Sequence, residues 1–517
     1  MRFVDAAAEL GLNYAMSNHG KTPLNIMDTA GGGVGLVDVD GDGWLDVIAV
    51  GRPQVGLFLQ RGGRFVEATQ EWGLAGLHAD WMGCAAGDPN GDGRPDLLLT
   101  GYEDTRLLEN TGSRFVDRTE QSGIDPGGWS MSGAFFDLDK DGRQDLIVVR
   151  YVVFNETTPE LCLVHEFMAA CGPEIYDGQP PFLYRNEGNW RFRDITKQQG
   201  LDKLLGKSWS VTTYDLNLDG WTDLYVSNDL TPGNLLINER GKLKDVGLES
   251  GTAYGGTGGL MGAMGIDIGD YDGDGLADIL VNTFAQDTTA LFHNDGNLLF
   301  TDQGVASGIG VPGVPYVKFG AGLVDLDLDA QLEVLMSGGH IRDNVDKIDP
   351  LQSYAHPLLL FDQQPRGHFV EVGKGAGEVF QRKYVGRGIA FGDVDNDGRL
   401  DALIGNLEGP LLLLLNRTPY GNRHWLGLSV VQNGSPALGA RVLCKTSLGE
   451  QFREVRTAYS VMVCNDPRVH FGLSTATSAK VTVKWTDGSK WGPKELRADA
   501  YYRIEKGREA QRQSAGS

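Results

Sequence analysis

Short apolar runs alternate with turns rich in aspartate and glycine along most of the chain. A small-residue run such as GGGVGLV (31–37) comes before an acidic turn, and an apolar run such as DVIAVG (46–51) follows it. A third run, such as VGLFLQ (55–60), and a short fourth, such as RFVE (64–67), complete the unit. Runs of this length and composition, bounded by turn residues, predict β-strands. Four short strands per unit predict the blade of a β-propeller.

The acidic turn of the first unit reads D-V-D-G-D-G-W-L-D (38–46), with carboxylates at positions 1, 3, 5 and 9 and glycine at position 6. Ca²⁺ takes about six to eight oxygen ligands, which carboxylates and the carbonyl of position 7 can supply. Glycine permits the sharp turn that a β-carbon would obstruct. Mg²⁺ is less suited, because it requires stricter octahedral geometry and retains its waters.

Seven such turns, called loops 1 to 7 in chain order, recur along the sequence. Turns rich in aspartate and glycine also occur as plain solvated loops, but seven copies at one place in a repeat favour calcium. The predicted ligands are Asp38, Asp40, Asp42, Trp44 and Asp46; Asp88, Asn90, Asp92, Arg94 and Asp96; Asp137, Asp139, Asp141, Arg143 and Asp145; Asp215, Asn217, Asp219, Trp221 and Asp223; Asp270, Asp272, Asp274, Leu276 and Asp278; Asp325, Asp327, Asp329 and Glu333; and Asp393, Asp395, Asp397, Arg399 and Asp401. In loop 6 Ala330 replaces the turn glycine and Glu333 the closing aspartate, so we expect calcium in six loops and leave loop 6 open.

Seven loops predict seven blades over residues 1–418. The fourth run is missing after LLLLLN (411–416), whereas an orphan copy, RFVD (2–5), stands at the N-terminus. We expect this N-terminal strand to complete the last blade and close the ring, which removes open sheet edges. The two long insertions, 154–181 and 337–357, both connect the second and third strands, so they should lie opposite the metal loops.

The character of the sequence changes near residue 419. Segments without acidic loops predict a small all-β domain over 419–507, and the polar tail 508–517 is expected to be disordered. The fold class is therefore all-β, a seven-bladed propeller with calcium loops followed by a small all-β domain.

Composition and charge exclude several classes of protein. No window approaches the roughly 18 consecutive apolar residues of a membrane helix. The formal charge is −23, and the loops hold 26 of the 69 acidic residues. Seven divalent ions would bring the charge to −9, so most of the acidity is accounted for by ligands and nucleic-acid binding is disfavoured.

Five cysteines suggest two disulfides, Cys162–Cys171 and Cys444–Cys464, with Cys84 free; the alternative is reduced thiols in the cytosol. Paired cysteines and calcium sites favour an extracellular or periplasmic location. The chain opens Met-Arg-Phe-Val-Asp without an apolar signal segment. Whether a leader is removed stays open, and so does a cytoplasmic location.

Candidate catalytic chemistry is sparse. His165, His340 and His356 lie in the two insertions and Asp229 ends a second strand, so all four should approach the same mouth of the ring. Together they could form a concave polar site. The alternative is that the histidines only pack loops. His165-Glu166 begins a zinc-protease motif, but Ala169 stands where the second histidine belongs.

Seven stretches stand out: GGGVGLVDVDGDGWLD (31–46), CGPEIYDGQPPFLYRNEG (171–188), MGIDIGDYDGDGLAD (264–278), GRGIAFGDVDNDGRLD (386–401), HWLGLSV (424–430), GARV (439–442) and DPRVHFGL (466–473). They resemble the cartilage acidic protein family, in which FG-GAP/VCBS-type repeats precede an ASPIC/UnbV domain. The resemblance implies an integrin-α-like calcium propeller. Family members include secreted matrix and receptor-binding proteins and many bacterial forms, and the UnbV name comes from enediyne antibiotic gene clusters.

Three functions remain open at this point. The first hypothesis is a calcium-stabilised scaffold that binds a protein or glycan through the insertion face. The second hypothesis is an enzyme with a small-molecule substrate at the propeller mouth, such as a lyase, dehydratase or natural-product tailoring enzyme. The third is a purely structural module. The sequence does not give the oligomeric state.

Overall fold

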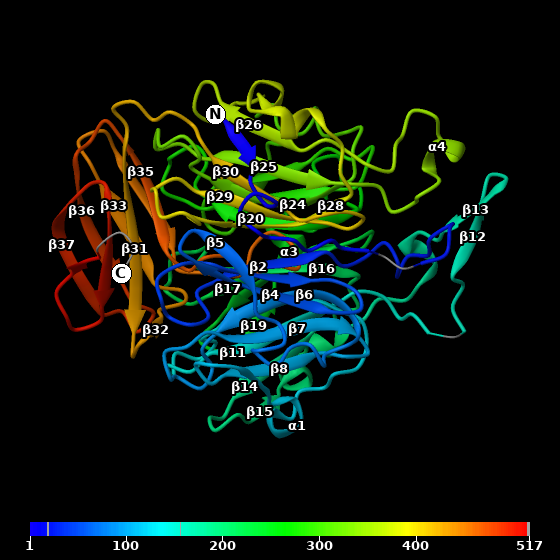
Figure 1. Ribbon diagram of the computed structural model, residues 1–517, viewed down its shortest axis with the longest axis horizontal. Helices are drawn as coiled ribbons and strands as arrows, with labels where there is room; N and C mark the ends of the chain where they lie inside the picture. Colours follow the sequence, from blue (N-terminus) through cyan, green and yellow to red (C-terminus); the bar gives the residue numbers. More distant parts are fainter. Residues whose placement is uncertain (18–19, 156, 514–517) are drawn as a thin grey trace.

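The computed structural model describes residues 1–17, 20–155 and 157–513. Nearly all of its regular structure is β-strand, in small and mostly antiparallel sheets, which confirms the all-β propeller prediction. Figure 1 shows sheets of residues 1–416 side by side, with the orange and red C-terminal strands at one end.

Within the described residues, the N-terminal four fifths of the chain form seven sheets of four strands each. In each sheet the strands follow one another by antiparallel pairing, from an innermost first strand outward. The sheets are β2 (Gly33–Val37), β3 (Asp46–Val50), β4 (Val55–Arg61) and β5 (Arg64–Glu67); β6 (Asp80–Gly87), β7 (Asp96–Tyr102), β8 (Arg106–Asn110) and β9 (Phe115–Asp117); β10 (Ser130–Phe136), β11 (Asp145–Arg150), β14 (Phe182–Asn186) and β15 (Phe192–Asp194); β16 (Ser208–Tyr214), β17 (Asp223–Asn228), β18 (Asn234–Asn238) and β19 (Leu243–Asp245); β20 (Ala263–Gly269), β21 (Asp278–Thr283), β22 (Ala290–Asn294) and β23 (Phe300–Asp302); β24 (Lys318–Val324), β25 (Glu333–Gly338), β26 (Leu359–Gln363) and β27 (Phe369–Glu371); and β28 (Gly386–Gly392), β29 (Asp401–Asn406), β30 (Leu412–Asn416) and β1 (Phe3–Asp5).

The first strands of neighbouring sheets contact one another around a closed cycle. β2 contacts β6, and the contacts continue through β10, β16, β20, β24 and β28 back to β2. Close approach explains the small residues of these strands: a β-carbon on Gly265 would lie 2.0 Å from the carbonyl oxygen of Phe319 in the next sheet. Glycine therefore occurs where the first strands of neighbouring sheets approach each other most closely.

Strand β1 is the fourth strand of the sheet formed by β28, β29 and β30. It pairs antiparallel with β30, with Phe3 opposite Asn416 and Asp5 opposite Leu414. Phe3 is buried, and its ring meets that of Phe380 edge-on at 5.9 Å. The N-terminus thus joins the C-terminal strand of the ring and covers the edge of β30.

Short helical turns connect the sheets and the insertions. They are α1 (Thr119–Ser122), α2 (Thr196–Gln199), α3 (Gly247–Ser250), α4 (Val345–Ile348), η1 (Pro173–Ile175), η2 (Leu201–Lys203), η3 (Gly373–Gly375) and η4 (Glu378–Gln381). Among the described residues, no helix has the length and apolar character needed to cross a membrane.

The C-terminal domain packs two sheets around a core that includes Leu426, Val442, Phe471 and Val481. The strands of the first are β31 (His424–Gln432), β32 (Ser435–Pro436), β35 (Val469–Ser474), β38 (Ala500–Glu505) and β39 (Gln511–Arg512), and those of the second are β33 (Arg441–Lys445), β34 (Glu450–Glu454), β36 (Ser478–Lys484) and β37 (Lys490–Arg497).

Two predictions about the C-terminal part require correction. The tail is not wholly irregular, because β39 pairs with the free edge of β38; residues 514–517 lie outside the described part. The predicted disulfide Cys444–Cys464 is wrong, because both cysteines are free. Cys444 lies on β33, whereas Cys464 lies outside the C-terminal domain, as described below. The disulfide Cys162–Cys171 is present.

The two insertions project together from the side of the ring opposite the C-terminal domain (Figure 1). The first contains the hairpin β12 (Leu161–Val164) and β13 (Phe167–Ala170), and the second contains α4. They contact each other through Arg342, whose Nε donates to the carbonyl of Ala170 at 3.1 Å, and Asn344, whose Nδ2 donates to that of Met168 at 2.9 Å.

Candidate metal centres and the axial channel

The seven acidic loops share one backbone conformation. Each connects the first and second strands of its sheet, and the residues at positions 4 and 6 have positive φ in all seven, between 53° and 81° at position 4 and between 73° and 94° at position 6. Left-handed backbone favours glycine, which explains the glycine at position 6 of six loops. The repeated sequence positions therefore adopt the same backbone conformation, residue by residue.

Loop 1 shows how the carboxylates are held. The Asp38 carboxylate accepts hydrogen bonds from the amides of Gly41, Asp42 and Gly43, at 2.8, 3.1 and 3.0 Å. The buried Asp46 carboxylate accepts from the amides of Val39 (2.9 Å) and Gln60 (2.8 Å). Position 1 therefore shapes the loop, and position 9 ties it to the third strand of the sheet.

Ligand atoms converge in several loops. In the triads Asp38–Asp40–Asp42, Asp137–Asp139–Asp145, Asp270–Asp272–Asp274 and Asp325–Asp327–Asp329, the nearest carboxylate oxygens lie within 4.8 Å of one another. Like charges at this distance repel unless a cation lies between them.

Burial and crowding perturb these carboxylates strongly. Burial first, and then the neighbouring carboxylates, raise the pKa of Asp38 to about 6, of Asp46 to about 8 and of Asp278 to about 7. Several buried carboxylate oxygens lack a hydrogen-bond partner among the described residues: Asp96 Oδ2, Asp139 Oδ1, Asp215 Oδ1, Glu333 Oε1 and Asp395 Oδ1. Buried polar atoms normally have partners, so these oxygens fit a hard divalent cation as the missing one.

A basic side chain from outside the loop accompanies each loop that has aspartate at position 3. Arg61 pairs with Asp40, and the other pairs are Arg185–Asp139 (2.5 Å), His293–Asp272 (3.4 Å), Arg423–Asp327 (2.6 Å) and Arg417–Asp395 (2.6 Å). Loops 2 and 4 have Asn90 and Asn217 there, and no ion pair from outside those loops is found in the described part of the chain. Arginines at position 7 of loops 2, 3 and 7 also pair with the aspartate at position 5 of their own loop. Each loop thus keeps two or three uncompensated carboxylates, a charge that one divalent cation lowers to one or neutralises.

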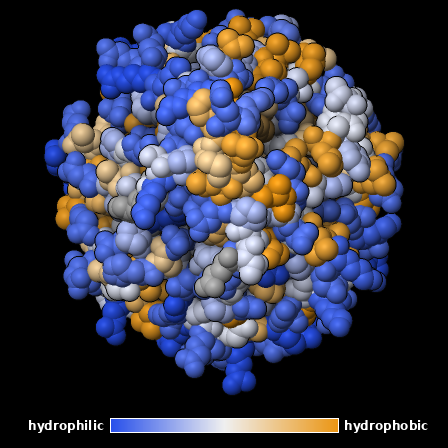
Figure 2. Space-filling view, turned by 90° about the vertical axis from the view of Figure 1, so that its right-hand side faces the viewer, coloured by the Kyte–Doolittle hydropathy of each residue, from blue (hydrophilic) through white to orange (hydrophobic). Residues whose placement is uncertain are grey.

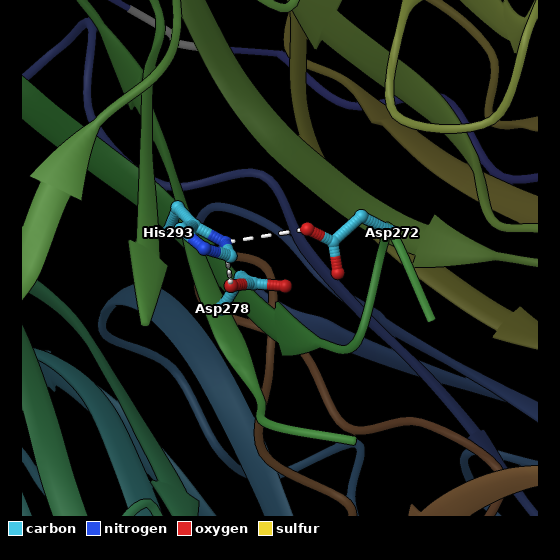
Figure 3. Close-up of side chains that lie close together, drawn as sticks. All are labelled: Asp272, Asp278 and His293. Carbon is cyan, nitrogen blue, oxygen red and sulfur yellow. Dashed lines mark ion pairs between the residues drawn. The ribbon is translucent and has the colours of Figure 1, made fainter. Parts of the chain in front are cut away.

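Loop 5 is distinctive because its basic partner is a histidine. Figure 3 shows Asp272 on the loop, Asp278 at the start of β21 and His293 on β22 directed toward one another. His293 Nδ1 lies 3.2 Å from Asp278 Oδ1 and 3.4 Å from Asp272 Oδ2. The adjacent Asp278 carboxylate raises the pKa of His293 to about 9.

Loop 6 retains the loop conformation despite its two substitutions. Ala330 adopts φ 73°, and its amide donates to Asp325 Oδ2 at 2.9 Å as the glycine amides do elsewhere. Glu333 is fully buried; its Oε2 accepts the Leu326 amide at 2.6 Å, while Oε1 is left without a partner. The longer side chain therefore keeps a free oxygen beside the three aspartates.

The C-terminal domain covers several loops with polar side chains. The hydroxyls of Ser435 and Tyr501 donate to Asp88 Oδ2 and Asp393 Oδ2, the latter at 2.7 Å. The Asp215 amide donates to the Glu454 carboxylate at 3.2 Å. A cleft of about 790 Å³ remains between loops 1, 2 and 7 and this domain, lined in part by Asp40, Arg94, Trp425, Arg468 and Tyr501.

Residues 456–466, called the channel segment, leave the C-terminal domain between β34 and β35 and enter the ring. They contact the first strand of each of the seven propeller sheets. Because these strands surround the centre of the ring, the channel segment lies along the ring axis. The hydrogen bonds are Cys464 N to Val34 O and Leu36 N to Cys464 O on β2, Cys84 N to Met462 O on β6, Met462 N to Ser132 Oγ on β10, Ser210 Oγ to Ser460 O on β16, Ser460 N to Ile266 O on β20, Ala321 N to Ser460 Oγ on β24, and Phe391 N to Asn465 Oδ1 on β28.

A buried ion pair anchors the channel segment at its start. Arg456 Nη2 lies 2.6 Å from Asp267 Oδ1 on β20, and the same nitrogen donates to the carbonyl of Ile268. Asp267 Oδ2 accepts the amide of Leu323 from the next sheet at 2.6 Å. The pair therefore joins the C-terminal domain to two sheets at once.

Of the four candidate catalytic residues, the structure brings His340 and His356 together. His165 is exposed at the turn of the β12–β13 hairpin. His340 and His356 are buried with ring centroids 6.4 Å apart, and burial lowers the pKa of His340 to about 3 and of His356 to about 4. Asp229 accepts instead from the Tyr151 hydroxyl at 2.7 Å and from Trp209 Nε1 at 3.4 Å.

Apolar side chains pack around Tyr151 and Trp209, the two hydrogen-bond partners of Asp229. One continuous buried cluster contains Ile26, Met27 and Ala30 of the N-terminal segment, Trp129, Tyr151, Trp209 and Phe319 of the sheets, and Val461 and Met462 of the channel segment. Fully buried Arg387 fixes the N-terminal segment there by donating from Nη2 to the Thr29 carbonyl at 2.8 Å.

Sequence reasoning missed the channel segment and the basic partners of the loops. A signal for the first was present: AYSVMVC (458–464) is apolar although it connects two strands of a small domain, and exposed connections are usually polar. For the second, a basic residue at the end of a third strand or just beyond it, as at Arg61, Arg185, His293 and Arg417, was the available signal.

Comparisons with known proteins agree with this architecture. A family profile described as FG-GAP-like repeat matches residues 38–99, 88–148 and 215–281, and one described as ASPIC and UnbV matches residues 430–511. Cartilage acidic protein 1 of Homo sapiens is 21% identical over 369 residues, which cover 69% of this chain and 50% of that protein. The protein of the same name from Mus musculus is 21% identical over 416 residues, covering 68% and 60%. The chain thus spans about half to three fifths of these curated relatives.

Solved structures show weaker likeness. An Agrocybe aegerita lectin, described as recognising non-reducing terminal N-acetylglucosamine, is 17% identical with a TM-score of 0.44 and covers 74% of this chain and 94% of its own. YCF48 from Cyanidioschyzon merolae is 9% identical with a TM-score of 0.41, covering 78% and 98%. These likenesses carry no argument about function.

Proposed function

We propose that this chain, a distant relative of the cartilage acidic proteins that joins FG-GAP-like repeats to an ASPIC and UnbV domain, is a calcium-binding β-propeller scaffold that binds a protein or glycan partner. The propeller would comprise residues 1–418 and the second domain residues 419–507. The disulfide of the first insertion and the calcium loops favour a location outside the cytoplasm.

The observation that carries the calcium proposal is the set of buried carboxylate oxygens without partners in five of the loops. The predicted residues at positions 1, 3, 5, 7 and 9 of loops 1 to 5 and 7 would hold six ions, with Asp325, Asp327, Asp329 and Glu333 a further site. A bound ion would neutralise carboxylates whose pKa burial raises. Calcium therefore serves folding and not chemistry.

Calorimetry of the whole chain tests this proposal. A site saturated a hundredfold above its Kd adds about 2.7 kcal/mol to the free energy of unfolding, so several sites should raise the unfolding midpoint substantially. We expect EGTA to lower the midpoint and added Ca²⁺ to restore it. Equal midpoints in excess EGTA and in excess Ca²⁺ would refute a stabilising role.

The insertion face is the proposed interaction surface. The β12–β13 hairpin places Leu163 opposite Met168, and these side chains are 68% and 47% exposed. Leu351 of the second insertion is 92% exposed. Figure 2 looks onto this side and shows hydrophobic groups scattered among hydrophilic ones. The disulfide and the contacts from Arg342 and Asn344 hold the hairpin in place, which reduces the entropy lost on binding.

An array of glycans and purified matrix proteins tests this surface. We expect wild-type signals to be lost in Leu163→Ser/Met168→Ser and retained in Leu248→Ser, a control that changes an equally exposed leucine on α3. Signals unchanged by the double substitution would refute the surface.

A further inference from the structure

Two of the three free cysteines meet inside the ring. Cys84 lies on β6 and Cys464 on the channel segment, and their Sγ atoms are 3.5 Å apart although 380 residues separate them in sequence. Both side chains are at most 1% exposed. The third, Cys444, is buried in the core of the C-terminal domain.

The backbones on both sides of this contact are fixed. Cys464 donates its amide to the Val34 carbonyl at 3.2 Å and accepts the Leu36 amide at 3.0 Å, while Cys84 donates its amide to Met462 at 3.3 Å. The sulfurs therefore meet because three chain segments are held in register, and not through a chance rotamer of a mobile loop.

Gly35 of β2 lies next to both sulfurs and, having no side chain, leaves room for them. A β-carbon on Gly35 would lie 2.5 Å from Cys464 Sγ and 3.2 Å from Cys84 Sγ, so any larger residue there would displace them. The surrounding side chains, such as Ile48, Val37 and Leu99, are apolar. They offer no further ligand that a thiolate-bound metal would require.

We propose that Cys84 and Cys464 are an oxidation site whose disulfide locks the channel segment inside the ring. A small-molecule disulfide is the oxidant: two exchange steps form the Sγ–Sγ bond, break the sulfur–sulfur bond of the oxidant, and transfer two hydrogens and two electrons to give two small-molecule thiols. Because the closed ring buries both sulfurs, the first exchange, which forms a mixed disulfide with the small molecule, takes place before the channel segment is seated. The second exchange takes place as the segment enters the ring and brings the two sulfurs together. The link would tie the C-terminal domain to the propeller covalently, independently of calcium.

Peptide mapping of the full chain tests the proposal. The protein is refolded from denaturant in a glutathione redox buffer in which Cys162–Cys171 forms, alkylated in denaturant and digested with trypsin. Cys84 and Cys464 fall in peptides 65–106 and 457–468, Cys444 in 442–445, and Cys162 with Cys171 in 151–185. We expect 65–106 and 457–468 as one cross-linked species, with Cys444 alkylated. Alkylation of Cys84 and Cys464 in a sample with Cys162–Cys171 oxidised would overturn the proposal, as would any link to Cys444.

Matched serine variants separate the site from general oxidation. Cys444→Ser should retain the cross-linked species, whereas Cys84→Ser should lose it and leave Cys464 alkylated. In a background of Cys162→Ser/Cys171→Ser, a reductant should lower the unfolding midpoint of the oxidised protein but not that of its Cys84→Ser derivative. Equal shifts in both would contradict a lock.

Discussion

Replacing Arg456 with methionine should weaken the attachment of the C-terminal domain to the ring. Methionine fills much of the same space, but it leaves the Asp267 carboxylate buried and without its cation. Asp267 is fully buried and its ion pair with Arg456 measures 2.6 Å, so water cannot replace the lost partner.

The magnitude follows from the burial of both groups. Removing one partner of a buried ion pair costs about 3–5 kcal/mol, because the remaining charge is uncompensated. Burial already raises the pKa of Asp267, whereas Arg456 lowers it. Without Arg456 the pKa rises further, so the loss of stability should become smaller as the pH falls and Asp267 is protonated.

Urea unfolding in saturating Ca²⁺ measures this effect. We expect Arg456→Met to lose about 3–5 kcal/mol and Arg456→Met/Asp267→Asn to recover more than half, because asparagine is neutral and still accepts a backbone hydrogen bond. The matched control is Arg497→Met, which removes an exposed arginine of β37 and should change the stability by less than about 0.5 kcal/mol. A loss below about 1 kcal/mol in Arg456→Met, or no recovery in the double variant, would refute the anchor.

Three further predictions concern other parts of the molecule. Deleting residues 1–5 exposes the edge of β30 and uncovers the surface around Phe380, so the melting temperature should fall by many degrees; an unchanged value in calorimetry would argue against closure by β1. Ala330→Gly relieves a left-handed alanine and should stabilise the protein by about 1 kcal/mol in urea unfolding, whereas a loss would show that loop 6 differs from the others. Burial raises the pKa of Asp229 to about 6, so the folded state binds its proton more tightly than the unfolded chain and stability is lost as the pH rises to about 6; Asp229→Asn should remove this component, and parallel pH profiles of the two proteins would contradict it.

The repeated parts of the fold were predictable because the residues that determine the loop and the strands recur in each repeat. Left-handed positions 4 and 6 make glycine at position 6 nearly obligatory, and alternating apolar runs define the strands on either side. Even the orphan RFVD at residues 2–5 carried information, since a fourth strand was lacking after residue 416.

Contacts between domains were not predictable in the same way. The channel segment occurs once, so no repetition marks it, and its partners come from seven different strands. Cys464 illustrates the difficulty: its place in a strand-like segment near that of Cys444 favoured pairing with Cys444, whereas the path of residues 456–466 through the ring brings it to Cys84. A shared face of the ring also did not distinguish His165, which is exposed on the hairpin, from His340, which is buried against His356.

The content of tightly bound metal in the purified protein tests the central claim most directly. After dialysis against metal-free buffer containing a weak chelator, elemental analysis should find six or seven calcium ions per chain, with loop 6 deciding between the two values. The count should fall by one in Asp393→Ala, in which Tyr501 loses its carboxylate partner together with the ion. A protein that is folded, by circular dichroism and calorimetry, and contains no calcium would contradict the account.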